Sequence, residues 1–85
     1  MSGKLVGHVT HYYGRLGVAV LDLTDSIHLG DVVHIFGGTT DLRQVVRSLQ
    51  IEHQAVEEVG PGQEVALKVD RRVRPRDRVF RLDEE

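Results

Sequence analysis

Cysteine is absent from this chain of 85 residues, and aromatic residues make up only 5% of it. Without thiols the protein can form no disulfide, no thiolate nucleophile and no metal site that depends on cysteine ligands. The composition fits a reducing, intracellular compartment, and we predict a cytoplasmic location. Because aromatic side chains are few, the chain has few residues that could anchor a water-excluding binding surface.

Long apolar runs are also missing. No stretch approaches the ~20 consecutive apolar residues that a transmembrane helix needs. Residues 1–4 lead into alternating sequence rather than into the apolar block of a signal peptide. We therefore expect no membrane partner. The length gives room for one domain, residues 1–85, with one hydrophobic core.

The charged residues are segregated along the chain. The formal net charge is −2, but residues 68–82 hold seven basic and two acidic residues, a local net charge of +5. The remainder of the chain sums to −7. Such segregation is a clue to the partner, and here it indicates an anionic one for residues 68–82.

Apolar residues recur with a period of two, which is the spacing of strands with one buried face. Valine is abundant, and its branched side chain suits a pleated sheet. Glycine and proline interrupt these runs, as turns require. The pattern predicts six strands, at residues 4–12, 17–23, 31–36, 42–51, 63–69 and 78–82.

The turns and the strand count together indicate the architecture. Gly60-Pro61-Gly62 is typical of a type II turn. Residues 48–58 could form a short helical turn or a bent strand, and Ala55 with its neighbouring glutamates slightly favours the turn. Six short strands with no helix to cover a flat sheet favour closure, because closure removes exposed edges. We predict an all-β fold, a small closed six-stranded β-barrel.

Several segments resemble the second domain of translational GTPases, the β-barrel that follows the GTP-binding domain in elongation factor Tu. Residues 27–35 (IHLGDVVHI) resemble its I-x-x-G-D-x-V-x-I segment, and residues 59–67 (VGPGQEVAL) resemble its A-x-P-G-x-x-V-x-L segment. Arg76-Asp77 stands where that family usually has Gly-Asp. The resemblance covers nearly the whole chain. It implies a barrel of that type and a ribosome or tRNA as the partner.

The sequence is also similar to the C-terminal barrel domain of collagenase-like peptidases, some members of which are linked to RNA modification. His11-Tyr12-Tyr13, after the first strand, resembles the sequences of that group. The chain has no G-x-x-x-x-G-K-S/T phosphate loop and no guanine-recognition motif. We therefore expect no nucleotide and no GTPase activity.

The candidate binding residues are arginines near the C-terminus: Arg71, Arg72, Arg74, Arg76 and Arg78. The last four alternate, so in an extended backbone they share one face and could contact a phosphate backbone. Tyr12 and Tyr13 would add base stacking if they lay nearby. The alternative is a solvated surface on which the arginines pair with Asp70, Asp77 or the acidic residues 83–85. Exposed pairs of that kind contribute only ~0–1 kcal/mol each.

We predict no catalytic residue, no metal site and no cofactor. His8 and His11 are three residues apart, which in a regular strand puts them on opposite faces, and no compact metal-ligand signature is present. Ser26 and Ser48 lack the context of a nucleophile elbow. The acidic residues look like turn and loop residues rather than acid–base machinery.

The preferred function is non-catalytic binding of RNA or a ribonucleoprotein through the arginines. The alternative is a protein–protein interaction module that docks on an RNA-modifying or peptidase-like enzyme, and residues 48–59 are long enough to form such a contact. Salt distinguishes the two, because phosphate binding weakens steeply with ionic strength and apolar docking does not.

Overall fold

The computed structural model describes residues 3–82, and the regular elements in that range are all β-strands. It contains no helix there, and hence none that could cross a membrane. The strands are β1 (Gly3–Tyr13), β2 (Val18–Leu23), β3 (Ile27–His28), β4 (Val32–Phe36), β5 (Asp41–Val45), β6 (Leu49–Ile51), β7 (Gln54–Val56), β8 (Glu58–Val59), β9 (Glu64–Lys68) and β10 (Arg78–Leu82).

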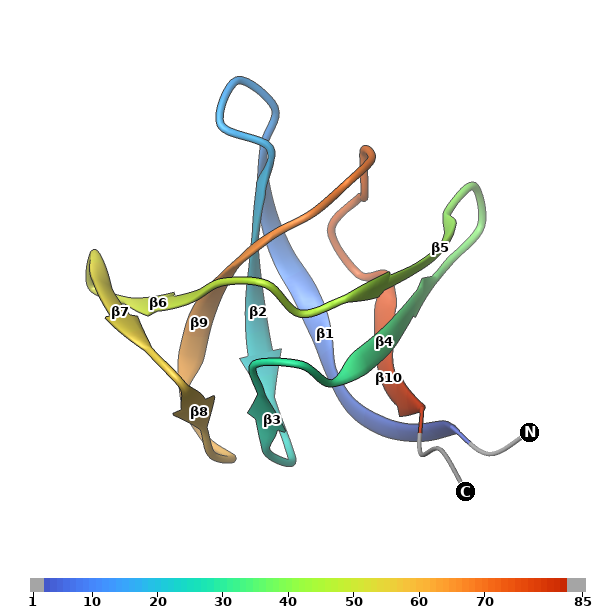
Figure 1. Cartoon of the computed structure of the whole chain (residues 1–85). Helices are drawn as coiled ribbons and strands as arrows, with labels where there is room; N and C mark the ends of the chain where they lie inside the picture. The colour runs from blue at the N-terminus through green and yellow to red at the C-terminus, as the bar shows by residue number, and fades with distance from the viewer. Residues whose placement is uncertain (1–2, 83–85) are drawn as a thin grey trace.

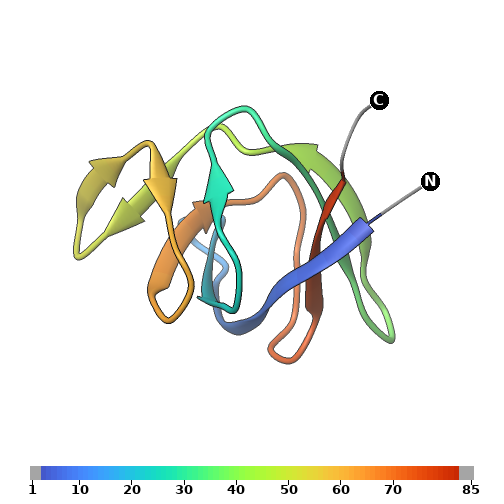
Figure 2. The ribbon, with the colours of Figure 1, turned by 90° about the horizontal axis from the view of Figure 1, so that it is seen from below.

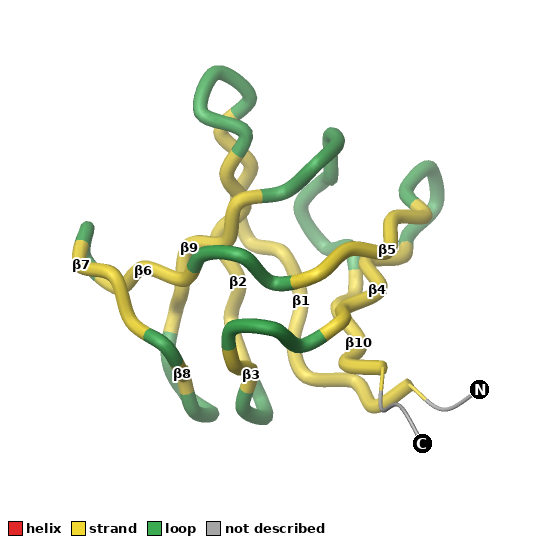
Figure 3. Tube along the Cα trace, viewed as in Figure 1, coloured by secondary structure: helices red, strands yellow, loops and turns green. Residues whose placement is uncertain are grey.

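Eight of these strands form one curled sheet in the order β5-β4-β10-β1-β2-β9-β6-β7, and β3 pairs with β8 in a separate two-stranded sheet. All the pairings are antiparallel. Figure 1 shows the strands around a common centre, and Figure 3 shows how short the connecting loops are. The all-β prediction is confirmed.

The prediction of a closed six-stranded barrel is wrong, because within residues 3–82 no sheet closes on itself and the hydrogen-bonded order ends at β5 and β7. The chain itself joins the two ends, since β5 leads through residues 46–48 into β6, and Figure 1 shows this segment crossing the molecule. The side chain of Gln44 on β5 bridges the gap to β9. Its Nε2 donates to the carbonyl of Lys68 (2.8 Å), and its Oε1 accepts from the N–H of Asp70 (2.8 Å). A side-chain amide thus makes the contact that a backbone ladder would make in a closed barrel.

Each predicted strand corresponds to an observed one, except that 42–51 divides into β5 and β6. The ambiguous residues 48–58 form the β6–β7 hairpin and the start of β8 rather than a helical turn. The reason is the two-residue turn at Glu52 (φ 50°) and His53 (φ 68°), where successive positive φ values reverse the chain between paired strands. The positive φ expected at Gly62 is also present (82°).

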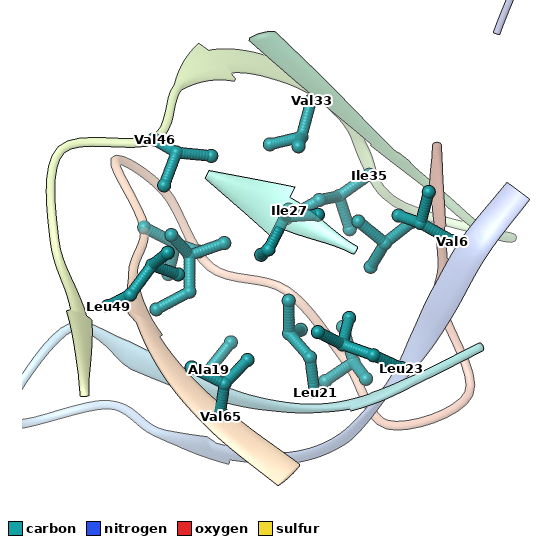
Figure 4. Packing of buried hydrophobic residues seen from close by; sticks show 14 of the residues in the cluster. Val6, Ala19, Leu21, Leu23, Ile27, Val33, Ile35, Val46, Leu49 and Val65 are labelled. Atoms are coloured by element: carbon teal, nitrogen blue, oxygen red, sulfur yellow. The ribbon is translucent and has the colours of Figure 1, made fainter. Parts of the chain in front are cut away.

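The core lies inside the curl of the large sheet, and β3 contributes Ile27 to its centre (Figure 4). Truncation of a fully buried leucine such as Leu21 would cost about 2–5 kcal/mol. The apolar residues of the core are Val6, Val9, Ala19, Leu21, Leu23, Ile27, Val33, Ile35, Leu42, Val46, Leu49, Val59, Val65, Leu67, Val69, Val73 and Val79.

The start of β1 and the end of β10 lie side by side, with Gly3 opposite Leu82 (Figure 2). Lys4 Nζ lies 2.7 Å from Asp25 Oδ2 in the turn after β2. This hydrogen bond, together with the one from the Ser26 N–H, holds the pKa of Asp25 below its usual value. Both terminal strands are tied to the same turn, because Arg81 Nη1 on β10 donates to the carbonyl of Ser26 (2.6 Å).

Candidate functional site

The predicted arginines lie on residues 70–78, which we call the arginine loop: an irregular segment up to Asp77, followed by Arg78, the first residue of β10. Figure 1 shows it rising between the β1–β2 hairpin and the β4–β5 turn. Its backbone is held at both ends: the N–H of Asp70 donates to Gln44, and the N–H of Arg76 donates to the carbonyl of Val9 (2.7 Å). The N–H of Val9 in turn donates to the carbonyl of Asp77 (2.8 Å). Contacts with β1 and β5 therefore fix the path of the loop.

Asp77 organises the turn at the tip of this loop. Its side chain is buried, and Oδ2 accepts a hydrogen bond from the N–H of Arg74 (2.8 Å). The N–H of Asp77 donates back to the carbonyl of Arg74 (3.1 Å), with Pro75 second and Arg76 third in the turn. Arg76 has φ 79°, which a type II turn requires at that position and which glycine adopts more easily. Asp77 bonds the backbone, and no ion pair joins it to an arginine side chain within residues 3–82.

Four of the five predicted arginines line two adjoining hollows that share Arg74 and Pro75. One hollow is formed by Arg74, Arg76 and Arg78 with residues 36–39. The other is formed by Arg72 and Arg74 with His11 and Tyr12. Arg71 is exposed and lines neither.

Only one of the two tyrosines lies near the arginine loop. Tyr12 is half-buried and also packs against the core, which limits the ring surface that it presents. Tyr13 is on the opposite face of β1 and lines a different groove. Tyr12 therefore lines the hollow beside Arg72 and Arg74, whereas Tyr13 adjoins it through its ring contact with His11 (centroids 4.8 Å apart).

Within residues 3–82, no ion pair joins an arginine of the loop to an acidic side chain. Arg74 Nε donates to Thr39 Oγ1 (2.9 Å), which orients its guanidinium group. Asp70 is paired with Arg47, which lies outside the loop. Among the described residues, no ion pair involves the other members: Arg71, Arg72, Arg76 and Arg78. The expected pairing with Asp70 or Asp77 is thus not found, and the acidic residues 83–85 lie outside the described part of the chain.

Gly37 is a site residue that the sequence did not single out. A β-carbon at this position would lie 2.0 Å from Asp77 Oδ1, so only glycine lets the β4–β5 turn approach the buried carboxylate. Gly38 next to it has open space. The sequence signalled a turn at Gly37-Gly38-Thr39 but could not show which segment it faces.

A second surface, which we call the outer groove, lies on the outward side of β2, β9 and β6. Its volume is about 780 Å³. It could not be predicted from the sequence, since its walls come from three separate segments, residues 13–20, 50–53 and 63–66. The lining residues are Tyr13, Leu16, Val18, Val20, Gln50, Ile51, Glu52, His53, Gln63, Glu64, Val65 and Ala66.

A third surface, the terminal face, is formed by outward side chains of β5, β4, β10 and the start of β1. The strand register places Val45 beside Val32 and Leu82, and His34 beside Phe80, which is opposite Leu5. Leu5, Phe36 and Val45 are each at least 40% exposed. The members of the face are Leu5, Val32, His34, Phe36, Arg43, Val45, Arg78, Phe80 and Leu82.

The histidines are dispersed. A bulge between Val9 and His11 brings His8 and His11 onto the same face of β1, which corrects the expectation that they oppose each other. His34 contacts Asp41 (2.7 Å), and His28 contacts Glu58 (3.3 Å). Within residues 3–82 no group of three histidine, aspartate or glutamate side chains is placed to hold a metal ion.

Comparison with known proteins identifies relatives over nearly the whole chain. An uncharacterized protease of Methanocaldococcus jannaschii, MJ0090, is 38% identical over 80 residues, which cover 93% of this chain and 20% of that protein. A collagenase of Porphyromonas gingivalis is 38% identical over 80 residues, covering 92% of this chain and 22% of that protein. The chain thus spans about a fifth of the length of these relatives. No protein-family model matches it.

The fold is shared with a solved domain. The C-terminal domain of a protein named as a U32 peptidase, from Geobacillus thermoleovorans, superposes with a TM-score of 0.87 at 24% identity, covering 94% of this chain and 93% of that one. Its selenomethionine variant gives a TM-score of 0.85 at 25% identity. The homologues of the chain are therefore domains of U32 peptidases and collagenases. This supports the similarity to collagenase-like peptidases, whereas the translation-factor resemblance gains no support from these relatives.

Proposed function

We propose that this protein is a non-catalytic accessory module of a U32-peptidase-like enzyme. The observation that carries the proposal is the match to relatives named as proteases, which covers nearly all of this chain but only about a fifth of theirs. The matched part has a core of its own, so it corresponds to a complete folding unit. Within residues 3–82 no three histidine, aspartate or glutamate side chains cluster, and the buried Asp77 bonds the backbone, which favours a binding role over a catalytic one.

The terminal face is the surface that fits contact with the enzyme. In the relatives, the rest of the polypeptide has to join the matched segment at one end or both. Gly3 and Leu82 are paired neighbours, so a body attached at either end emerges beside this face. The exposed Leu5 and Val45 give it an apolar character that an attached domain would cover.

A graft tests the accessory role. The matching 80 residues of the P. gingivalis collagenase would be deleted, and then replaced by this chain. We expect the deletion to lower proteolytic activity or thermal stability, and the graft to restore it.

Surface variants show whether the terminal face makes the contact. A graft with Leu5→Glu and Val45→Glu should fail to restore the enzyme, whereas one with Leu29→Glu should succeed, because Leu29 has the same exposure as Val45 (42%) but lies outside the face. A folded wild-type graft without effect would contradict the accessory role. Restoration by the double variant would contradict only the choice of face.

A second candidate function, phosphate-backbone binding by the arginine loop, is favoured by one observation. None of its five arginine side chains has an acidic partner among the described residues, and unpaired guanidinium groups are the usual contacts of nucleic-acid phosphates.

Anisotropy of a fluorescein-labelled single-stranded RNA, titrated at several salt concentrations, tests it. We expect binding to weaken with salt, and its salt slope to fall by roughly 2 when Arg72, Arg76 and Arg78 become glutamine. A variant with glutamine at Lys4, Arg15 and Arg43, none of which lines either hollow beside the loop, has the same charge change and should bind like the wild type. Equal losses in both variants would leave only nonspecific charge attraction.

A further inference from the structure

We propose that the outer groove binds an extended polypeptide segment in which basic and apolar side chains alternate. This inference is independent of the accessory role and of the arginine loop. It rests on the shape of the groove, its apolar walls and the charge of its rim.

The shape follows from the strand register. Val20 on β2 lies opposite Ala66 on β9, and Ala66 lies opposite Gln50 on β6, so these three side chains form one outward row. The methyl group of Ala66 is small, which leaves a hollow between its two larger neighbours. The β1–β2 hairpin, with Leu16, and the tip of the β6–β7 hairpin, with His53, bound this hollow on its sides.

The walls are apolar and exposed to solvent. Leu16 is 64% exposed and Tyr13 is 48% exposed, and both line the groove beside the half-buried Val18. Apolar side chains gathered around a hollow, rather than scattered over the surface, are typical of a binding site. A partner that placed apolar side chains there would remove this surface from water.

The rim is acidic. Among residues 3–82, Glu52 and Glu64 line the groove and no lysine or arginine does, while Lys68 stands opposite the lining residue Val18 at the other end of β9. Glu64 is directly opposite Asp22 in the β2–β9 pairing, and like charges in that arrangement are destabilising. No ion pair within residues 3–82 gives any of these three carboxylates a cation. A ligand that brings its own positive charge would relieve the repulsion.

An extended segment with basic and apolar side chains would both cover the apolar walls and neutralise the acidic rim. In an extended chain, successive side chains point in opposite directions, so alternate apolar residues can enter the hollow while the intervening basic residues reach the rim. A small cation would satisfy the rim alone, and an uncharged apolar molecule would satisfy the walls alone.

Three labelled eight-residue peptides test the proposal by fluorescence anisotropy with the full chain. They are alternating Lys-Val, alternating Glu-Val and alternating Lys-Ser. We expect the Lys-Val peptide to bind at least about tenfold more tightly than either of the others, which corresponds to ~1.4 kcal/mol. Equal binding of Lys-Val and Glu-Val, or no binding of Lys-Val at millimolar concentration, would overturn the proposal.

Two variants locate the site. Leu16→Ser should weaken Lys-Val binding about tenfold, whereas Leu29→Ser, a leucine exposed elsewhere, should leave it unchanged. Glu64→Lys should reduce the preference for Lys-Val over Glu-Val. Because Leu16 and Glu64 are exposed, both variants should stay folded, with Leu16→Ser melting like the wild type and Glu64→Lys at most slightly more stable. If sedimentation equilibrium shows a dimer that Leu16→Ser dissociates, a second copy of the chain occupies the groove and the peptide proposal is wrong.

Discussion

The arginine loop and the outer groove carry opposite charges on different kinds of backbone. The basic side chains project from an irregular segment whose path is set by bonds to Gln44, Val9 and Asp77. The acidic Glu64 projects from a regular strand, where its position is set by pairing with β2. The positions of the charged side chains on the loop therefore depend on a few long-range polar contacts, whereas the position of Glu64 in the groove depends on sheet register. The two surfaces should respond differently to substitution.

Gly37→Ala should have the largest effect on the loop. The new methyl group would collide with the buried carboxylate of Asp77, and we expect the free energy of unfolding to fall by about 3 kcal/mol. Gly38→Ala is the matched control, because nothing lies near its β-carbon, and its effect should stay within ~1 kcal/mol. Urea denaturation measures both. Equal effects would mean that the contact between the β4–β5 turn and Asp77 is not rigid.

Gln44→Leu should loosen the loop by a different route. It leaves the N–H of Asp70 and the carbonyl of Lys68 without the amide that bonds both, at a cost of about 2 kcal/mol. Hydrogen exchange at Asp70 should accelerate, while exchange in β2 should follow only the global loss of stability. Gln50→Leu, on the exposed side of β6, should change stability by less than ~0.5 kcal/mol. An unchanged Asp70 amide would show that Gln44 does not anchor the loop.

Arg76→Gly should stabilise the protein modestly, by about 0.5–1 kcal/mol, because it relieves a positive φ that glycine adopts freely. Arg78→Gly, in β10, should destabilise it by a similar amount, since glycine weakens a strand. If the turn is strained at Arg76, thermal unfolding should show a raised melting temperature for Arg76→Gly and a lowered one for Arg78→Gly. Destabilisation by both would argue against strain at Arg76.

Glu64→Lys should have the smallest effect, a gain of about 0.5 kcal/mol, because it converts a repulsive cross-strand pair with Asp22 into an attractive one. The gain should shrink in high salt. Glu57→Lys, in the loop between β7 and β8, makes the same charge change away from Asp22 and serves as the control. A gain of equal size from Glu57→Lys would point to overall net charge rather than to register.

Much of the strand pattern could be predicted from the sequence, because alternation and turn residues are local signals. β10 was predicted with the bounds that it has in the structure, and Gly62 has the positive φ that its turn requires. The division of 42–51 into two strands could not be predicted, since its apolar pattern runs on through Val46. The two-residue turn at Glu52 and His53 was missed because neither residue is a usual choice for positive φ.

The candidate surfaces were predictable only in part. The arginines were visible as a run of charge, but their lack of acidic partners within residues 3–82 depends on Asp70 facing Arg47 and Asp77 turning inward. The outer groove forms where three segments far apart in sequence meet, and no local sequence pattern predicts that contact.

What the sequence by itself determined is the class of fold and the segregation of charge, because alternation of side chains and the sign of a residue are properties of neighbours along the chain. Tertiary structure alone decided that the sheet stays open and is bridged by Gln44. It also decided that Gly37 lies against the carboxylate of Asp77 and that Ala66 leaves a hollow between its two neighbouring strands. Each of these depends on contacts between segments far apart in sequence, whose distances only the packed core fixes.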